Sequence, residues 1–214
     1  MVKMVLAILL LPVCVGAALA LWRVLQTSGK ADTIWVAFLS GVACWWVIYL
    51  LLPKPMWVYV FGHELTHVIW TWLMGGRVKK FKATSTGGHV VVTKNNFLIA
   101  LAPYFFPLYA MLVVLIFAAG NALWDWRPRI VWFHLLLGAA YAFHVTLTWH
   151  ILQSHQTDIS EQGYLFSSVV IFLGNITVLL VGIPLLVSTV DVATAFRWWG
   201  EAMWMFLQKL GSLR

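Results

Sequence analysis

Several long stretches of this chain contain no Asp, Glu, Lys or Arg, and each is long enough to cross a lipid bilayer. Among them are residues 4–22, 34–52 and 97–119. A helix that spans the hydrocarbon core needs about 20 predominantly apolar residues. Only 10% of the 214 residues are charged and 62% are hydrophobic, whereas about a quarter of a soluble domain is charged. We therefore predict an all-α, multi-pass integral membrane protein, which in a bacterium would lie in the cell (inner) membrane.

The apolar pattern predicts about six transmembrane helices and two further elements. Between the third and fourth helices, two short stretches at 78–86 and 89–93 flank Gly87-Gly88, which predicts a short β-hairpin. Beyond Asp191, apolar residues recur three and four positions apart, which predicts a C-terminal helix lying in the membrane interface. The predicted spans are 4–22, 34–52, 56–74, 97–119, 130–152 and 164–187.

The charged residues and cysteines exclude several classes of function. The net charge of +7 comes from Lys and Arg that stand in short connections, where they can meet anionic lipid headgroups. We therefore expect the lipid bilayer, and no nucleic acid, as a partner. Cys14 and Cys44 each lie inside an apolar run without a neighbouring Cys or His. Neither a disulfide framework nor a cysteine metal site is expected.

The third predicted span carries a cluster of ionisable residues, His63-Glu64-Leu65-Thr66-His67. On a helix the two histidines are one turn apart on the same face, so both imidazoles can bind one zinc ion. Glu64 then reaches the metal-bound water rather than the metal. Zinc lowers the pKa of that water towards about 7, and a carboxylate beside it can accept the proton during attack on a peptide carbonyl. The pattern predicts one zinc ion per chain, with Glu64 as general base and acid.

A catalytic zinc site needs a third protein ligand, and the end of the fifth predicted span offers His155, Asp158 and Glu161. We favour Asp158, because it follows a long apolar helix where the chain can unwind and turn inward. The alternative for Asp158 is an N-cap of the next helix. His134, His144 and His150 also lie along the fifth predicted span, and one of them is a candidate to support the zinc ligands or to stabilise an oxyanion.

Proline and asparagine residues add candidates after the hairpin. Pro103 and Pro107 lie four residues apart in the fourth predicted span, where each removes a backbone donor and can bend the helix. Asn95 and Asn96 are candidates for holding substrate or an oxyanion. The alternative is that they only form a turn.

Taken together, these residues resemble the site-2 protease family of intramembrane zinc metalloproteases, over roughly residues 56–165. The resemblance implies that His63, His67 and Asp158 bind zinc and that Glu64 is the catalytic glutamate. It also implies that residues 78–93 form a hairpin that pairs with an extended substrate. The motifs that carry it are the His-Glu-x-x-His helix, Gly75-Gly76-Arg77-Val78, Gly87-Gly88-His89-Val90, Leu101-Ala102-Pro103-Tyr104 and Asp158.

With this resemblance, we predict that the chain has three parts. Residues 1–55 form two N-terminal transmembrane helices, 56–165 the metalloprotease core, and 166–214 the last transmembrane helix with the interfacial helix. The expected substrate is a membrane-embedded or membrane-proximal protein. A regulatory membrane protein is a second candidate partner. The substrate-binding residues are expected to be Gly88, His89, Val90, Val91, Asn95 and Asn96.

The sequence also departs from the family pattern and leaves alternatives open. Ile159 follows Asp158 where the family usually has glycine, and two extra spans precede the catalytic helix. A prenyl-protein peptidase would use Glu161 as the third ligand. Seven histidines in a membrane chain also suit a histidine-box di-iron oxygenase. A non-catalytic relative that binds a membrane partner is the remaining alternative.

Overall fold

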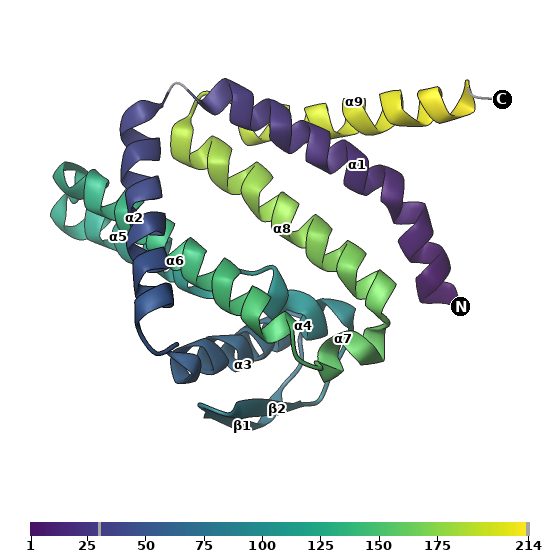
Figure 1. Ribbon diagram of the computed structural model, residues 1–214, viewed down its shortest axis with the longest axis horizontal. Helices are drawn as coiled ribbons and strands as arrows, with labels where there is room; N and C mark the ends of the chain where they lie inside the picture. The colour runs from purple at the N-terminus through teal and green to yellow at the C-terminus, as the bar shows by residue number, and fades with distance from the viewer. Residues whose placement is uncertain (30, 213–214) are drawn as a thin grey trace. The chain divides into compact units, whose positions relative to one another are not determined.

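A computed structural model describes residues 1–29 and 31–212 of the chain (Figure 1). The helices pack into two compact units, one made of Met1–Asp32 and Thr157–Arg214 and the other of Thr33–Gln156. The three-part division at 1–55, 56–165 and 166–214 stays a prediction, and residues 213 and 214 of its last part lie outside the described residues.

Several helices of the described residues are long and apolar enough to cross a membrane. The four that qualify singly are α1 (Val2–Ser28), α2 (Asp32–Leu51), α6 (Ile130–Leu152) and α8 (Tyr164–Val187). This confirms the predicted all-α membrane fold. α3 (Met56–Leu73), the third predicted span, is not among them, since its two histidines and its glutamate lower its hydropathy. By length and hydropathy, four of the six predicted spans qualify, or five with the bent pair described next.

The fourth predicted span, 97–119, is not one continuous helix, and the bend expected at Pro103 and Pro107 is present. Pro103 and Pro107 cannot donate to a helical hydrogen bond, and the chain breaks where they lie. The two sides of the break are bent by 79° and together make either a fifth, broken span or a re-entrant loop. The segment forms α4 (Phe97–Leu101), the 3-10 turn η1 (Ala102–Tyr104) and α5 (Leu108–Trp124).

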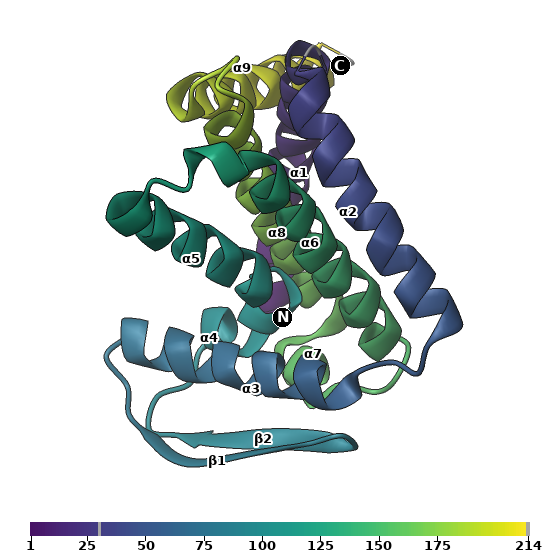
Figure 2. The ribbon, with the colours of Figure 1, turned by 90° about the vertical axis from the view of Figure 1, so that its left-hand side faces the viewer.

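The predicted β-hairpin is present and lies along α3 (Figure 2). Strands β1 (Val78–Thr84) and β2 (Gly87–Val92) pair antiparallel, with Thr84 opposite Gly87. The turn is therefore Ser85-Thr86, two residues earlier than the predicted Gly87-Gly88 turn, and both glycines belong to β2. A β-bulge interrupts the pairing between Val78 and Lys80.

Two glycines end α3 and direct the chain into the hairpin. Gly75 has φ +73°, a left-handed conformation that glycine adopts without strain. Its amide donates to the Trp72 carbonyl at 2.9 Å, and the Gly76 amide donates to the Thr71 carbonyl at 2.8 Å. This is the Schellman pattern of a helix C-terminus. The Gly75-Gly76 pair therefore sets where the catalytic helix stops and where β1 begins.

In the unit of residues 33–156, α2 and α6 approach each other closely at two glycines. A Cβ atom at Gly41 would lie 1.8 Å from the Leu135 carbonyl oxygen, and one at Gly138 would lie 2.0 Å from the Phe38 carbonyl oxygen. Small residues allow such backbone approach between membrane helices. The 3-10 turn η2 (Arg127–Arg129) precedes α6. One apolar cluster in the core of this unit contains Trp45, Tyr59, Val60, Ala142, Phe143 and Leu147.

In the other unit, α1 packs against α8 and against α9 (Val192–Gly211). Gly16 lets α1 contact the backbone of Met203, and the Trp199 indole donates to the Val13 carbonyl at 3.0 Å. Asp191 caps α9, because its Oδ1 accepts from the Thr194 amide at 2.8 Å. The C-terminal helix is thus present, while its location in a membrane interface stays a prediction. The short helix α7 (Thr157–Gln162) precedes α8.

Candidate active site

The two histidines of α3 lie one helical turn apart with their rings in contact. The ring centroids of His63 and His67 are 5.0 Å apart and the rings stand edge to face at 77°. Both side chains are half-buried. The predicted common face is therefore present, and two imidazoles on it can reach a single ion.

The ring of His67 is held by a backbone carbonyl of α4. His67 Nδ1 lies 2.8 Å from the Ile99 carbonyl oxygen. A carbonyl oxygen only accepts hydrogen bonds, so Nδ1 carries the proton in this contact and Nε2 is the ring nitrogen that can bind a metal. Metal-binding histidines commonly have such a second partner on the other ring nitrogen, which fixes both tautomer and ring orientation.

The carboxylate of Glu64 is buried beneath the hairpin. The side chain is 6% exposed. A Cβ atom added at Gly88 would lie 2.6 Å from Glu64 Cγ and 2.8 Å from Glu64 Oε1. Only a residue without a side chain lets β2 lie this close to the carboxylate. Of the residues that the sequence predicted for substrate binding, Gly88 is thus placed directly against the predicted catalytic glutamate.

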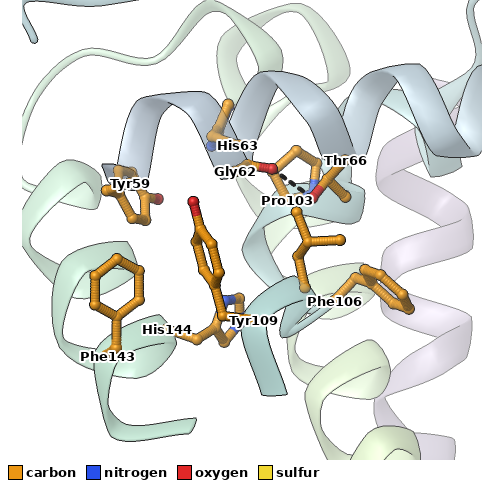
Figure 3. A pocket seen from close by; sticks show the side chains of 10 residues that line it. Tyr59, Gly62, His63, Thr66, Pro103, Phe106, Tyr109, Phe143 and His144 are labelled. Carbon is orange, nitrogen blue, oxygen red and sulfur yellow. Dashed lines mark hydrogen bonds between the residues drawn. The ribbon is translucent and has the colours of Figure 1, made fainter. Parts of the chain in front are cut away.

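A small, partly open pocket lies beside His63 within this unit (Figure 3). Tyr59 and His63 from α3 line one side of it, and Phe143 and His144 from α6 line the other. His144 is 7% exposed, and among the described residues its Nε2 has no hydrogen-bond partner. Sequence reasoning did not distinguish His144 from His134 and His150 as a candidate supporting residue, because it could not show which of the three lies beside α3.

Gly62 and Tyr109 position the part of α3 that precedes the motif. The Tyr109 hydroxyl donates to the Val58 carbonyl. A Cβ atom at Gly62 would lie 2.6 Å from the Tyr109 ring, so glycine at this position admits the tyrosine. The Thr66 hydroxyl donates to the Gly62 carbonyl at 2.8 Å within the same helix (Figure 3). The motif helix is therefore fixed against α5 as well as against the hairpin.

The three candidates for the third ligand lie near α7. Asp158 is half-buried in the first turn of α7, which begins at Thr157, so it is not the residue before the helix that an N-cap would be. His155 and Glu161 are exposed. The assignment of Asp158 as the third ligand stays a prediction.

The remaining predicted substrate residues lie on the hairpin and just after it. Asn96 caps α4, since its Oδ1 accepts from the Ile99 amide at 2.9 Å, and Asn95 is exposed. His89 and Val91 are exposed on β2, whereas Val90 is half-buried. A role of these residues in holding substrate stays a prediction, although the Asn96 side chain already has a structural one.

The model of the peptidase M50B-like family matches residues 34–153. This segment is more than half of the 214 residues and contains α2, α3, the hairpin and the helices through α6. The chain belongs to the peptidase M50B-like family. Membership confirms the predicted relationship to the site-2 proteases. No curated protein and no solved structure matches the chain. The family match ends five residues before Asp158.

The residues present fit the zinc ion that the family implies. Two imidazoles share a face of α3, and the contact of His67 Nδ1 with the Ile99 carbonyl makes Nε2 the nitrogen of that ring that can bind a metal. A carboxylate is buried next to them on α3. Nitrogen and carboxylate donors in this combination suit zinc. This M50B-like chain is thus an integral membrane protein with a metallopeptidase motif.

Proposed function

We propose that this M50B-like chain is an intramembrane zinc endopeptidase that hydrolyses a peptide bond of a membrane-embedded or membrane-proximal protein. His63, His67 and Asp158 would hold one zinc ion. When bound, zinc supplies a Lewis acid that lowers the pKa of a water and polarises the scissile carbonyl. The observation that carries the proposal is the His67 ring fixed on the Ile99 carbonyl beside a buried Glu64, within a segment that matches a peptidase family.

Glu64 moves the proton in this proposal. Its carboxylate accepts a proton from the attacking water and returns it to the leaving amine when the peptide bond breaks. The position of Glu64 under β2 supports this role, because Gly88 covers the carboxylate and keeps bulk water from it. A dry site strengthens the interactions that a carboxylate makes with developing charge.

The hairpin is proposed to bind substrate by β-strand addition. A helical peptide hides its carbonyls, so a substrate must become extended before one of them can be attacked. Each strand of a two-stranded sheet has one edge without a partner strand, and an extended peptide can pair there. β2 is the strand that contacts Glu64 through Gly88, so a peptide bound to the hairpin would lie near the catalytic residue.

The test does not require a known substrate. Membranes from cells that produce the wild type or Glu64→Gln are compared by labelling of new protein N-termini followed by mass spectrometry. Glu201→Gln is the matched control, since Glu201 is an exposed glutamate of α9 that pairs with Arg23 at 3.5 Å. We expect a set of new termini with the wild type and the control that Glu64→Gln lacks. Identical termini with all three proteins would refute the endopeptidase proposal.

The same preparations test the third ligand. Asp158→Asn and Glu161→Gln are purified in detergent, and zinc per chain is measured for each. We expect zinc to be lost with Asp158→Asn alone. Loss with Glu161→Gln alone would move the assignment to Glu161.

A further inference from the structure

The short segment of residues 97–104 contacts both histidines of the motif. The Ile99 carbonyl oxygen lies 2.8 Å from His67 Nδ1, and the Tyr104 ring stands edge to face on His63 with centroids 5.2 Å apart. Ile99 is 2% exposed and Tyr104 is 1% exposed, so both contacts are shielded from solvent. The geometry of this segment therefore bears directly on how the two imidazoles are oriented.

In an uninterrupted helix the Ile99 carbonyl would be engaged by the amide four residues later. That residue is Pro103, which has no amide hydrogen. The amide of Ala102 donates to the Leu98 carbonyl, and those of Phe105 and Phe106 donate to the Ala102 carbonyl. These neighbouring backbone donors are engaged elsewhere, and the Ile99 carbonyl remains available to a side chain.

The segment is also fixed at its start. Asn96 Oδ1 accepts from the Ile99 amide at 2.9 Å, which sets the first turn of α4. Leu101 and Ala102 are fully buried, so α4 and η1 cannot shift without loss of packing. The orientation of the Ile99 carbonyl is therefore set by the cap on one side and by the break at Pro103 on the other.

We propose that Pro103 is a positioning residue for the metal site: by lacking an amide hydrogen, it leaves the Ile99 carbonyl free to accept from His67 Nδ1. This selects the tautomer whose Nε2 binds the metal. The inference rests on the proposed zinc site. The proposed effect comes from the missing amide hydrogen of Pro103 and not from the shape of its ring. The two effects can be separated experimentally.

The experiment compares three backbones at position 103 in the full-length protein. Pro103→Ala introduces a competing amide donor. Replacement of Pro103 by lactic acid, the ester analogue of alanine introduced by nonsense suppression, has the alanine side chain but again no amide hydrogen. Pro107→Ala is the matched control, because Pro107 is also buried in the same bend, and the carbonyl four residues before it belongs to Pro103 rather than to the His67 partner Ile99. Folding is checked by circular dichroism and size-exclusion chromatography in detergent.

The first readout is the affinity for zinc alone, measured by competition with a chromophoric chelator. Loss of an outer partner of a metal ligand typically weakens metal binding 10–100-fold. We expect Pro103→Ala to bind zinc at least about tenfold more weakly than the wild type. The lactic acid variant and Pro107→Ala should stay close to the wild type. Equal weakening by alanine and lactic acid, or no weakening by alanine, would overturn the proposal.

The second readout keeps the test valid even if the wild type binds no zinc. Nitrogen-15 NMR of histidine-labelled, metal-free protein distinguishes a protonated Nδ1 from a protonated Nε2, and His67→Ala identifies the signals of His67. We expect protonated Nδ1 in the wild type and the lactic acid variant, and a mixture in Pro103→Ala. The same tautomer in all three would overturn the inference about Pro103, whereas absent zinc with the expected tautomers would overturn only the proposed function.

Discussion

Helices α3 and α6 lie in the same unit and both bury polar side chains, but they use them differently. On α6, Thr146 accepts from the Trp45 indole at 2.8 Å, and Thr148 accepts from the Tyr59 hydroxyl at 3.5 Å. These bonds connect α6 to α2 and α3. On α3, the Ile99 carbonyl holds His67 at Nδ1, and Gly88 lies against Glu64. The polar groups of α6 thus join helices to one another, whereas those of α3 are the proposed zinc ligands and general base.

The largest expected effect concerns the packing of α6. In Gly138→Val the new side chain would overlap the Phe38 carbonyl, since even a Cβ atom would lie 2.0 Å from that oxygen. We expect a loss of about 3 kcal/mol or more in unfolding free energy, at the upper end for overpacking. Thermal unfolding in detergent measures it. Gly182→Val on α8, where an added Cβ meets nothing within 4 Å, is the control, and equal losses would contradict the close α2–α6 contact.

The next effect concerns α3 and should appear in activity rather than in stability. Gly88→Ala places a methyl group against Glu64 Oε1, so either the carboxylate or β2 must move. A displacement near 1 Å at a catalytic group can cost about 100-fold in rate. We expect new N-termini in the membrane assay to form at least about tenfold more slowly, with zinc content unchanged. Gly182→Ala is the matched control, and unchanged cleavage by Gly88→Ala would show that the contact does not position Glu64.

One buried threonine on each helix tests the comparison of α3 with α6 through a smaller change in unfolding free energy. Thr146→Val on α6 leaves the Trp45 indole without its partner, which should cost about 1–2 kcal/mol. Thr66→Val on α3 removes only a bond to the Gly62 carbonyl of its own helix, so we expect less than about 0.5 kcal/mol. Thermal unfolding of both variants measures the difference. If Thr66→Val cost as much as Thr146→Val, the two helices would not differ in how they use buried hydroxyls.

The smallest effect tests a group away from both helices. Hydrogen bonds from the Thr194 amide and hydroxyl lower the pKa of the Asp191 carboxyl at the start of α9. A carboxyl whose pKa is lowered by folding stabilises the folded protein at pH values above its ordinary, unfolded-state pKa. This stabilisation is lost as the pH falls through the lower pKa of the folded state. In Asp191→Asn, the loss of stability between neutral pH and pH 3 should therefore be slightly smaller than in the wild type. Equal acid sensitivity of the two proteins in thermal unfolding would contradict this.

The sequence predicted the elements of the site because local patterns define them. The i and i+4 histidines, the Val- and Thr-rich strands and the long apolar runs each specify their structure within a few residues. The break at Pro103 and Pro107 was expected only as a bend, since the sequence does not show how far the backbone turns there.

Contacts between distant elements could not be predicted in the same way. The approach of Gly88 to Glu64 depends on where the hairpin folds back, and the bond from His67 to Ile99 depends on the direction in which α4 ends. Asn96 shows the same limit, because a capping asparagine and a substrate-binding one look alike in sequence. Residue chemistry alone therefore predicted the candidate catalytic groups but not the contacts that orient them.

The most direct test of the account is the metal content of detergent-purified protein, measured by inductively coupled plasma mass spectrometry. The wild type is compared with His67→Ala and with His150→Ala, a histidine at the end of α6 outside the motif. The account predicts about one zinc per chain in the wild type and in His150→Ala, and loss of that zinc in His67→Ala. Two iron ions per chain, or folded wild-type protein that binds no metal, would contradict it.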